Sequence, residues 1–192
     1  MELLAPAGNL ECALAAFDAG ADAVYCGLKR FNARERTENF TFEEMSRLLA
    51  YAHKLNRHVY VTFNTLIKED ELDEAAQELA RLEQLRPDAI IIQDLGIARI
   101  AREYFPKLVL HGSTQMGLHN SAGLAYAGKL GLSRVILERQ TTLAELEPAC
   151  SPPGSAVGAE TAENANSPAA EGTVQQTETG SSFPRRISER RN

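Results

Sequence analysis

The alternation of short apolar runs with amphipathic segments is the feature that most limits how this chain can fold. Each run is short enough to be a buried strand, and each is followed by residues at helical spacing or by the start of a helix. The six runs span residues 2–5, 23–26, 59–63, 89–92, 108–110 and 134–137. Strict alternation of strand and helix predicts a parallel sheet, either doubly wound or closed as an eight-stranded barrel.

Two observations separate these architectures. No Gly-x-Gly-x-x-Gly pattern follows the first apolar run, which argues against a doubly wound dinucleotide-binding fold. A complete barrel needs eight strands and roughly 200–250 residues, whereas residues 1–150 supply six strands. We therefore predict an α/β fold, an incomplete (β/α)8 TIM-type barrel of about six βα units. The first and last strands would leave two exposed sheet edges.

The composition of the chain changes near Cys150. Residues 151–192 are dominated by Ser, Gly, Ala, Glu, Thr and Pro, and their only large apolar residues are Val157, Val174, Phe183 and Ile187. Such a segment cannot bury enough apolar surface to offset its ordering entropy. We predict that residues 1–150 form the partial barrel and that 151–192 form a disordered low-complexity tail. Alternatives are a linker to another domain, or an end created by a disrupted reading frame.

Polar residues follow the predicted strands and indicate a binding site. The stretch from Leu108 to Asn120 reads LVLHGSTQMGLHN, an apolar run that breaks into polar and small residues before a helix cap. Loops that follow parallel strands share one face of the sheet, where ligands bind. The predicted substrate-binding residues are Arg34, Asn64, Asp94, His111, Gln115, Glu138 and Arg139. Ordinary roles stay open, since Asn9 and Asp94 can cap helices and His111 can be a core imidazole.

Composition and motifs exclude several functions. There is no His-Glu-x-x-His, Gly-x-Ser-x-Gly or phosphate-binding Gly-x-x-x-x-Gly-Lys motif. The net charge of -6 argues against a broadly basic nucleic-acid surface. No apolar stretch approaches the ~20 residues of a membrane span, and no signal peptide is recognisable. Cys12, Cys26 and Cys150 show no metal-binding or redox spacing, so we expect reduced thiols and a cytoplasmic protein.

Several motifs together carry a resemblance to a known family. They are ELLAPAG at 2–8, GADAVYCG at 20–27, the segment 111–120 and VILER at 135–139. In this order they resemble the peptidase U32 family, also called collagenase-like proteases. The family name implies a peptidase, but better-understood members are oxygen-independent hydroxylases of tRNA, ribosomal RNA or the ubiquinone ring. Resemblance to those members implies a [4Fe-4S] cluster held by four cysteines, with prephenate as oxygen donor in the RNA-modifying members.

The chain departs from the family pattern after residue 150. The family continues into segments rich in His, Gly and Cys that carry the cluster ligands, and this chain has the low-complexity segment instead. We therefore expect no cofactor in this chain and an N-terminal fragment of a U32-type hydroxylase that is inactive alone. RNA or a small molecule would be its substrate. Two alternatives stay open, a U32 peptidase and a non-catalytic binding module that self-associates through the open barrel edges.

Overall fold

A computed structural model describes residues 2–34 and 38–150. The chain divides into two units, Met1–Ser151 and Pro152–Asn192, and the described residues all belong to the first. The prediction of a disordered tail over 151–192 therefore lies outside the described residues. Among the described residues, no helix is long and apolar enough to cross a membrane.

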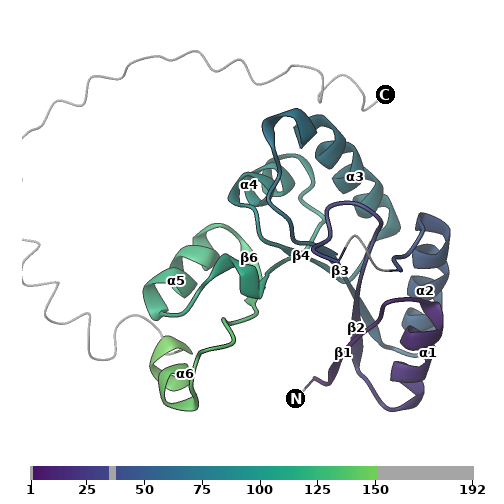
Figure 1. The fold of residues 1–192 in the computed structure, drawn as a ribbon, viewed down its shortest axis with the longest axis horizontal. Coiled ribbons are helices and arrows are strands. Elements are labelled where there is room, and N and C mark those ends of the chain that lie inside the picture. The colour runs from purple at the N-terminus through teal and green to yellow at the C-terminus, as the bar shows by residue number, and fades with distance from the viewer. Residues whose placement is uncertain (1, 35–37, 151–192) are drawn as a thin grey trace, which may run out of the picture. The chain divides into compact units, whose positions relative to one another are not determined.

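The described strands form one parallel sheet whose spatial order follows the sequence, β1-β2-β3-β4-β5-β6 (Figure 1). Their bounds are β1 Leu4–Pro6, β2 Ala23–Gly27, β3 His58–Phe63, β4 Ala89–Ile92, β5 Leu110–Gly112 and β6 Leu132–Val135. A doubly wound sheet would reverse its strand order at a switch point, and this sheet does not. The prediction of an incomplete TIM-type barrel is confirmed.

Helices connect the strands, and several of them begin at a residue whose side chain caps the helix. Their bounds are α1 Leu10–Asp18, α2 Phe42–Lys54, α3 Leu72–Leu85, α4 Leu95–Tyr104, α5 Ser121–Lys129 and α6 Leu143–Cys150. Two short 3-10 turns, η1 Glu69–Glu71 and η2 Thr114–Met116, precede α3 and α5. Thr41 begins α2 with a capping box, because its side chain accepts from Glu44 N and its own N–H donates to the Glu44 carboxylate.

The main core lies between the sheet and the helices on its outer side, where Figure 1 shows α1 to α4. Right-handed connections between neighbouring parallel strands place successive helices on one face, as the sequential strand order requires. Val61 and Ile90 point to this outer core and are fully buried. Tyr60 and Ile91 point to the opposite, inner face of the sheet. The inner face is the interior of the partial barrel.

Three strands begin two residues away from their predicted starts. β1 and β5 each begin two residues later than the apolar runs predict, and β6 begins two residues earlier. The shift of β6 follows from its pairing, since Leu132 lies opposite Leu110 and a bulge between Leu110 and His111 changes the register. The edges were expected to be open, and within the described part β1 pairs only with β2 and β6 only with β5.

Candidate functional site

A cavity of about 890 Å³ lies at the carboxyl ends of the strands, on the inner side of the sheet. Its volume is within the range of sites that bind small molecules. Five of its walls come from segments that directly follow β1, β2, β3, β5 and β6, and Ile91 of β4 adds an apolar surface. Polar lining residues are Asn32, Arg34, Glu38, Asn39, Thr62, Asn64, Ser113, Thr114, Gln115, Glu138 and Arg139.

Side-chain amides join the loops after β2, β3 and β5. The Nδ2 of Asn64 donates to Oε1 of Gln115 at 2.8 Å, and the backbone N–H of Ala33 donates to Oδ1 of Asn64 at 3.1 Å. Ser113 holds Gln115 from the other side, because its Oγ accepts from Gln115 N at 3.3 Å. The oxygens of both amides are thus used within the protein, which leaves N–H donors of Asn64 and Gln115 to serve a ligand.

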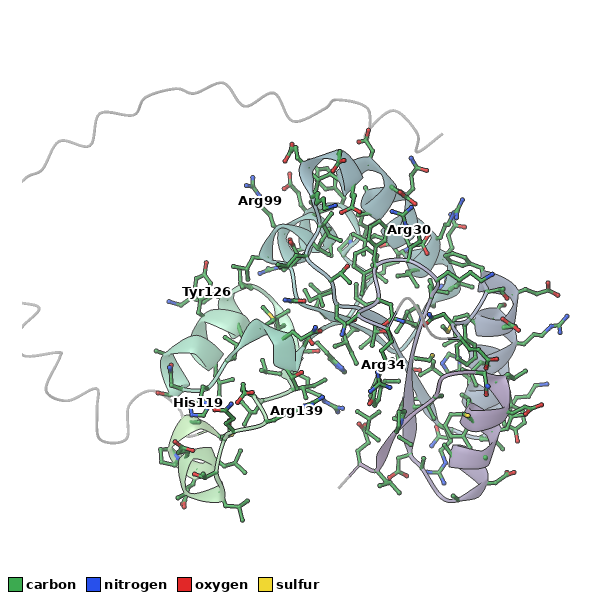
Figure 2. The ribbon with its side chains drawn as sticks, viewed as in Figure 1. Arg30, Arg34, Arg99, His119, Tyr126 and Arg139 are labelled. Carbon is green, nitrogen blue, oxygen red and sulfur yellow. The ribbon has the colours of Figure 1, made fainter. Side chains whose placement is uncertain are left out.

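Charged side chains also line the cavity. Arg34 comes from the loop after β2 and Arg139 from the segment after β6, and in Figure 2 Arg139 extends toward the part of the view in which Arg34 lies. Glu38 and Glu138 also line the cavity. Both carboxylates are held by the protein, Glu38 by the Nδ2 of Asn9 at 2.7 Å and Glu138 by the N–H of Gln140 at 2.6 Å. Two guanidinium groups in the wall of one cavity favour an anionic ligand group.

Five of the seven predicted substrate-binding residues line this cavity, namely Arg34, Asn64, Gln115, Glu138 and Arg139. Asp94 is not among the lining residues, because its carboxylate caps α4 through the N–H of Ile97 at 2.9 Å and accepts from Ile67 N at 3.3 Å. Asn9 likewise caps α1, accepting from Cys12 N at 2.9 Å. For these two residues the structure shows the ordinary capping roles.

His111 lies inside the sheet rather than at the cavity wall. It is 6% exposed, and its ring meets the ring of Tyr60 edge to face with centroids 4.9 Å apart. Burial, followed by the nearby positive charge of Arg134, lowers the pKa of His111 to about 4. The imidazole is therefore neutral near pH 7. It belongs to an interior cluster with Tyr60, Arg134 and Glu2, in which Arg134 pairs with Glu2 at 2.6 Å.

Three buried polar residues of the site were not predicted, namely Asn32, Thr62 and Ser113. Thr62 faces the inner side of β3, and period-two alternation within the strand could have indicated this. Ser113 lies in the polar stretch that the sequence marks as a pocket wall. Asn32 is one polar residue among many in the loop after β2, so no local pattern distinguishes it.

The cysteines of the described part do not fit a shared metal cluster. The Cys26 thiol points into the outer core, 3.8 Å from the sulfur of Met45, and burial raises its pKa to about 12. Cys12 and Cys150 are exposed, one on α1 and the other at the end of α6. Among residues 2–34 and 38–150, no three His, Cys, Asp or Glu side chains are arranged to hold a metal ion. The donor set of a [4Fe-4S] cluster is not present in these residues.

One hydroxyl, imidazole and carboxylate lie in a row away from the cavity. Thr141 Oγ1 is 3.1 Å from Nδ1 of His119, and Nε2 of His119 is 3.5 Å from Oε1 of Glu145. The other oxygen of Glu145 accepts from the N–H and hydroxyl of Thr142 at 2.8 and 2.7 Å. Glu145 thus reaches back to the residue before α6, and His119 links the loop before α5 to α6.

Six parallel strands in sequential order, with a polar cavity at their carboxyl ends, define a partial βα barrel whose site lies where such barrels bind ligands. The sequence model of peptidase family U32 matches residues 8–151 of the chain. The chain belongs to peptidase family U32.

Curated relatives extend this assignment. Uncharacterized protease MJ0090 of Methanocaldococcus jannaschii is 40% identical over 147 residues, which are 77% of this chain and 35% of that protein. tRNA hydroxylation protein P of Escherichia coli is 37% identical over 146 residues, 76% of this chain and 32% of that protein. The 23S rRNA 5-hydroxycytidine C2501 synthase of Escherichia coli is 33% identical, covering 76% of this chain and 22% of the enzyme. The chain spans about a third of the length of the first two relatives.

A solved structure agrees on the fold. The U32 peptidase Mk0906 superposes with a TM-score of 0.57 at 10% sequence identity, over 71% of this chain and 58% of that one. The copper homeostasis protein CutC of Streptococcus agalactiae superposes with a TM-score of 0.56 at 16% identity, over 77% and 78% of the two chains. Identities this low show a common fold and nothing about activity.

Proposed function

We propose that this chain forms the substrate-binding part of an RNA hydroxylase of the U32 family, and that its cavity takes one nucleotide of an RNA strand. The observation that carries the proposal is the cavity itself, in which amide donors and two arginines converge at the carboxyl ends of the strands. The names of two relatives, which refer to tRNA hydroxylation and to a 23S rRNA hydroxycytidine, support RNA as the substrate class.

The cavity chemistry suits a nucleotide taken out of its stack. Enzymes that modify a base read its edge by hydrogen bonds inside a pocket, and Asn64 and Gln115 present N–H donors to this cavity. The guanidinium groups of Arg34 and Arg139 in the cavity wall match the bidentate geometry of phosphate. In this arrangement the amides orient the base and the arginines hold the backbone on either side of it.

The hydroxylation step itself requires more than the described residues. The resemblance to the hydroxylases of the family implies an iron-sulfur cluster, and Cys12, Cys26 and Cys150 do not form its donor set. We propose that the chain binds RNA but does not hydroxylate it alone, and that it acts in the cytoplasm, where RNA is modified and thiols stay reduced.

RNA binding by the full 192-residue chain tests the proposal. The probe is a fluorescently labelled anticodon stem-loop of Escherichia coli tRNA, and the readout is anisotropy at several salt concentrations. Arg139→Ala removes one phosphate contact, so we expect a weaker affinity and a smaller slope of log affinity against log salt, by about one. Gln115→Ala removes a contact to the base, and we expect an affinity roughly five- to tenfold lower.

Arg99→Ala is the matched control for Arg139→Ala. Both substitutions remove one positive charge, but Arg99 lies on α4, pairs with Glu103 at 3.7 Å and points away from the cavity (Figure 2). A general electrostatic attraction would respond equally to the two substitutions. Equal losses in Arg99→Ala and Arg139→Ala, or no measurable RNA binding by the unaltered chain, would contradict the proposal.

A peptidase is the second candidate, and the row formed by Thr141, His119 and Glu145 is the observation that favours it. A hydroxyl next to an imidazole that is oriented by a carboxylate is the arrangement of serine-type nucleophiles. Incubation with casein and gelatin, with and without a chelator, tests this activity. Cleavage that is lost in Thr141→Ala would favour the peptidase over the RNA-binding role. Absence of cleavage by the unaltered chain would rule out the peptidase function.

A further inference from the structure

Asn32 is the most enclosed polar residue among the described residues of the loop that carries Arg34. It is 5% exposed and uses both ends of its amide. Its Nδ2 donates to Oδ1 of Asn39 at 2.6 Å, and its Oδ1 accepts from the backbone N–H of Arg34 at 3.2 Å. The hydroxyl of Thr62, on β3, lies 3.2 Å from the same oxygen. One side chain thus joins both arms of the loop to the sheet.

Only an amide at position 32 satisfies the hydrogen-bond partners that surround it. Asn39 donates its own Nδ2 to the backbone oxygen of Arg34 at 3.0 Å, which fixes its Oδ1 toward Asn32. An aspartate at position 32 would keep the acceptor for Arg34 N but would place a second acceptor against Asn39 Oδ1. Buried acceptors that face each other without a proton between them are costly.

The backbone around Asn32 is shaped to hold it. Gly27, at the end of β2, has no room for a Cβ atom, because that atom would overlap the Asn32 amide. Phe31 has φ of 58°, in the left-handed region that large residues rarely adopt, and its ring packs on Phe63 with centroids 5.0 Å apart. Phe31 is strained and Gly27 cannot be replaced without a clash, and both lie against one buried amide. The surrounding structure therefore holds this loop backbone in a conformation that it would not adopt alone.

We infer that Asn32 is a positioning residue of the site, which holds the backbone of Arg34 so that its guanidinium lines the cavity together with Arg139. Asn32 itself lines the cavity and acts on a ligand through Arg34. The inference rests on the proposed function for its effect on RNA affinity. Its effect on the loop is independent of that function.

Two variants and a matched control test the inference. Asn32→Asp keeps the size of the side chain, Gly27→Ala displaces the amide without changing it, and Asn120→Ala removes another asparagine that only caps α5 through the N–H of Gly123. Amide hydrogen exchange is measured in each full-length chain. A carboxylate at position 32 is repelled by Asn39 Oδ1, and a Cβ at position 27 displaces the amide, so in both variants the acceptor moves away from Arg34 N. We expect the Arg34 amide to exchange about tenfold faster in these two variants, because its hydrogen bond is weakened or lost. We expect no change in Asn120→Ala.

The Ile90 amide, which donates to Val109 O in the middle of the sheet at 2.8 Å, reports whether each variant remains folded. If its exchange is unchanged while that of Arg34 accelerates, Asn32 positions the loop. If the Arg34 amide exchanges as in the unaltered chain, the inference is overturned. This readout needs no ligand, so it decides the inference even if the chain binds no RNA.

RNA affinity then separates positioning from general stabilisation. If Asn32 acts through Arg34, Gly27→Ala, which displaces the amide without adding a charge, and Arg34→Ala each weaken binding of the labelled stem-loop by a similar factor. The double variant then binds no more weakly than Arg34→Ala. Independent losses whose factors multiply in the double variant would show that Asn32 does not act through Arg34, and would overturn the inference.

Discussion

Protonation of His111 should destabilise the fold in a pH range where few other groups titrate. The imidazole is buried on the inner face of the sheet, and its pKa is lowered from 6.5 to about 4 by burial and by Arg134, partly offset by Glu2. Unfolding returns the imidazole to water, where it gains a proton more readily. A lowered pKa in the folded state means that stability is complete above pH 6.5 and decreases as the pH falls toward 4.

The size of the effect follows from the two pKa values. With a pKa of 6.5 unfolded and about 4 folded, linkage gives a loss of about 2 kcal/mol between pH 7 and pH 5, and about 3 kcal/mol by pH 4. A domain of this size has a free energy of unfolding of roughly 5–15 kcal/mol, so the loss is readily measured. Glu2 and Asp88, whose pKa values are lowered from 4.5 and 3.8, contribute mainly below pH 5.

Urea unfolding followed by circular dichroism at pH 7, 6 and 5 measures this loss. His111→Phe keeps an aromatic ring against Tyr60 and cannot titrate, so we expect its stability to change by less than about 0.5 kcal/mol over this range. His53→Phe is the control, since His53 is exposed in the last turn of α2 and pairs with Asp88 at 3.2 Å, apart from the cluster around His111. It should retain the full decrease. The reasoning is refuted if the unaltered chain and His111→Phe lose the same stability between pH 7 and pH 5.

Three further outcomes are expected. Asp94→Ala removes the cap of α4 and the bond to Ile67 N, and should lower the free energy of unfolding by about 1–2 kcal/mol in urea titrations. Ile90→Ala, in the outer core, should lower it by about 2–5 kcal/mol in the same assay. Because β1 and β6 pair on one side only in the described part, light scattering of the purified chain should show a discrete oligomer, and a monodisperse monomer would contradict pairing through these edges.

Anaerobic treatment of the chain with iron and sulfide adds one more test, and it should leave no visible absorbance of a bound cluster, since the described cysteines cannot share one. A bound cluster would contradict the cysteine assignment.

Local sequence patterns predict those parts of the fold that are decided locally. The capping box at Thr41 is present because it needs only residues three apart in the chain. The strands and their order follow from apolar periodicity and from the rule that neighbouring βα units stay adjacent. The residues that directly follow β3 and β6, including Asn64 and Glu138, reach the cavity for the same reason.

The depth of a residue along its strand is not a local property, and His111 shows the consequence. The apolar run suggests that the strand ends at Leu110, which would leave His111 in the loop. Pairing of Gly112 with Ile92 and Val135 carries β5 two residues further. His111 then becomes an inner-face residue of the sheet, and the cavity wall starts at Ser113. A one-residue difference in strand register exchanges the two faces, so polar character alone does not distinguish a site residue from an interior one.

Contacts between residues far apart in the sequence cannot be predicted from local patterns. One such contact lies on the inner face of the sheet. Glu2, just before β1, binds Arg134 of β6 at 2.6 Å across 132 residues, and accepts from the hydroxyl of Tyr60 at 2.8 Å. β1 and β6 are the two edges of the sheet, so this pair draws the edges toward one another across the barrel interior. The same curvature brings Arg139, beyond β6, to the cavity that Arg34, beyond β2, also lines. No local motif encodes this charge pair of Glu2 and Arg134, because its two members lie 132 residues apart.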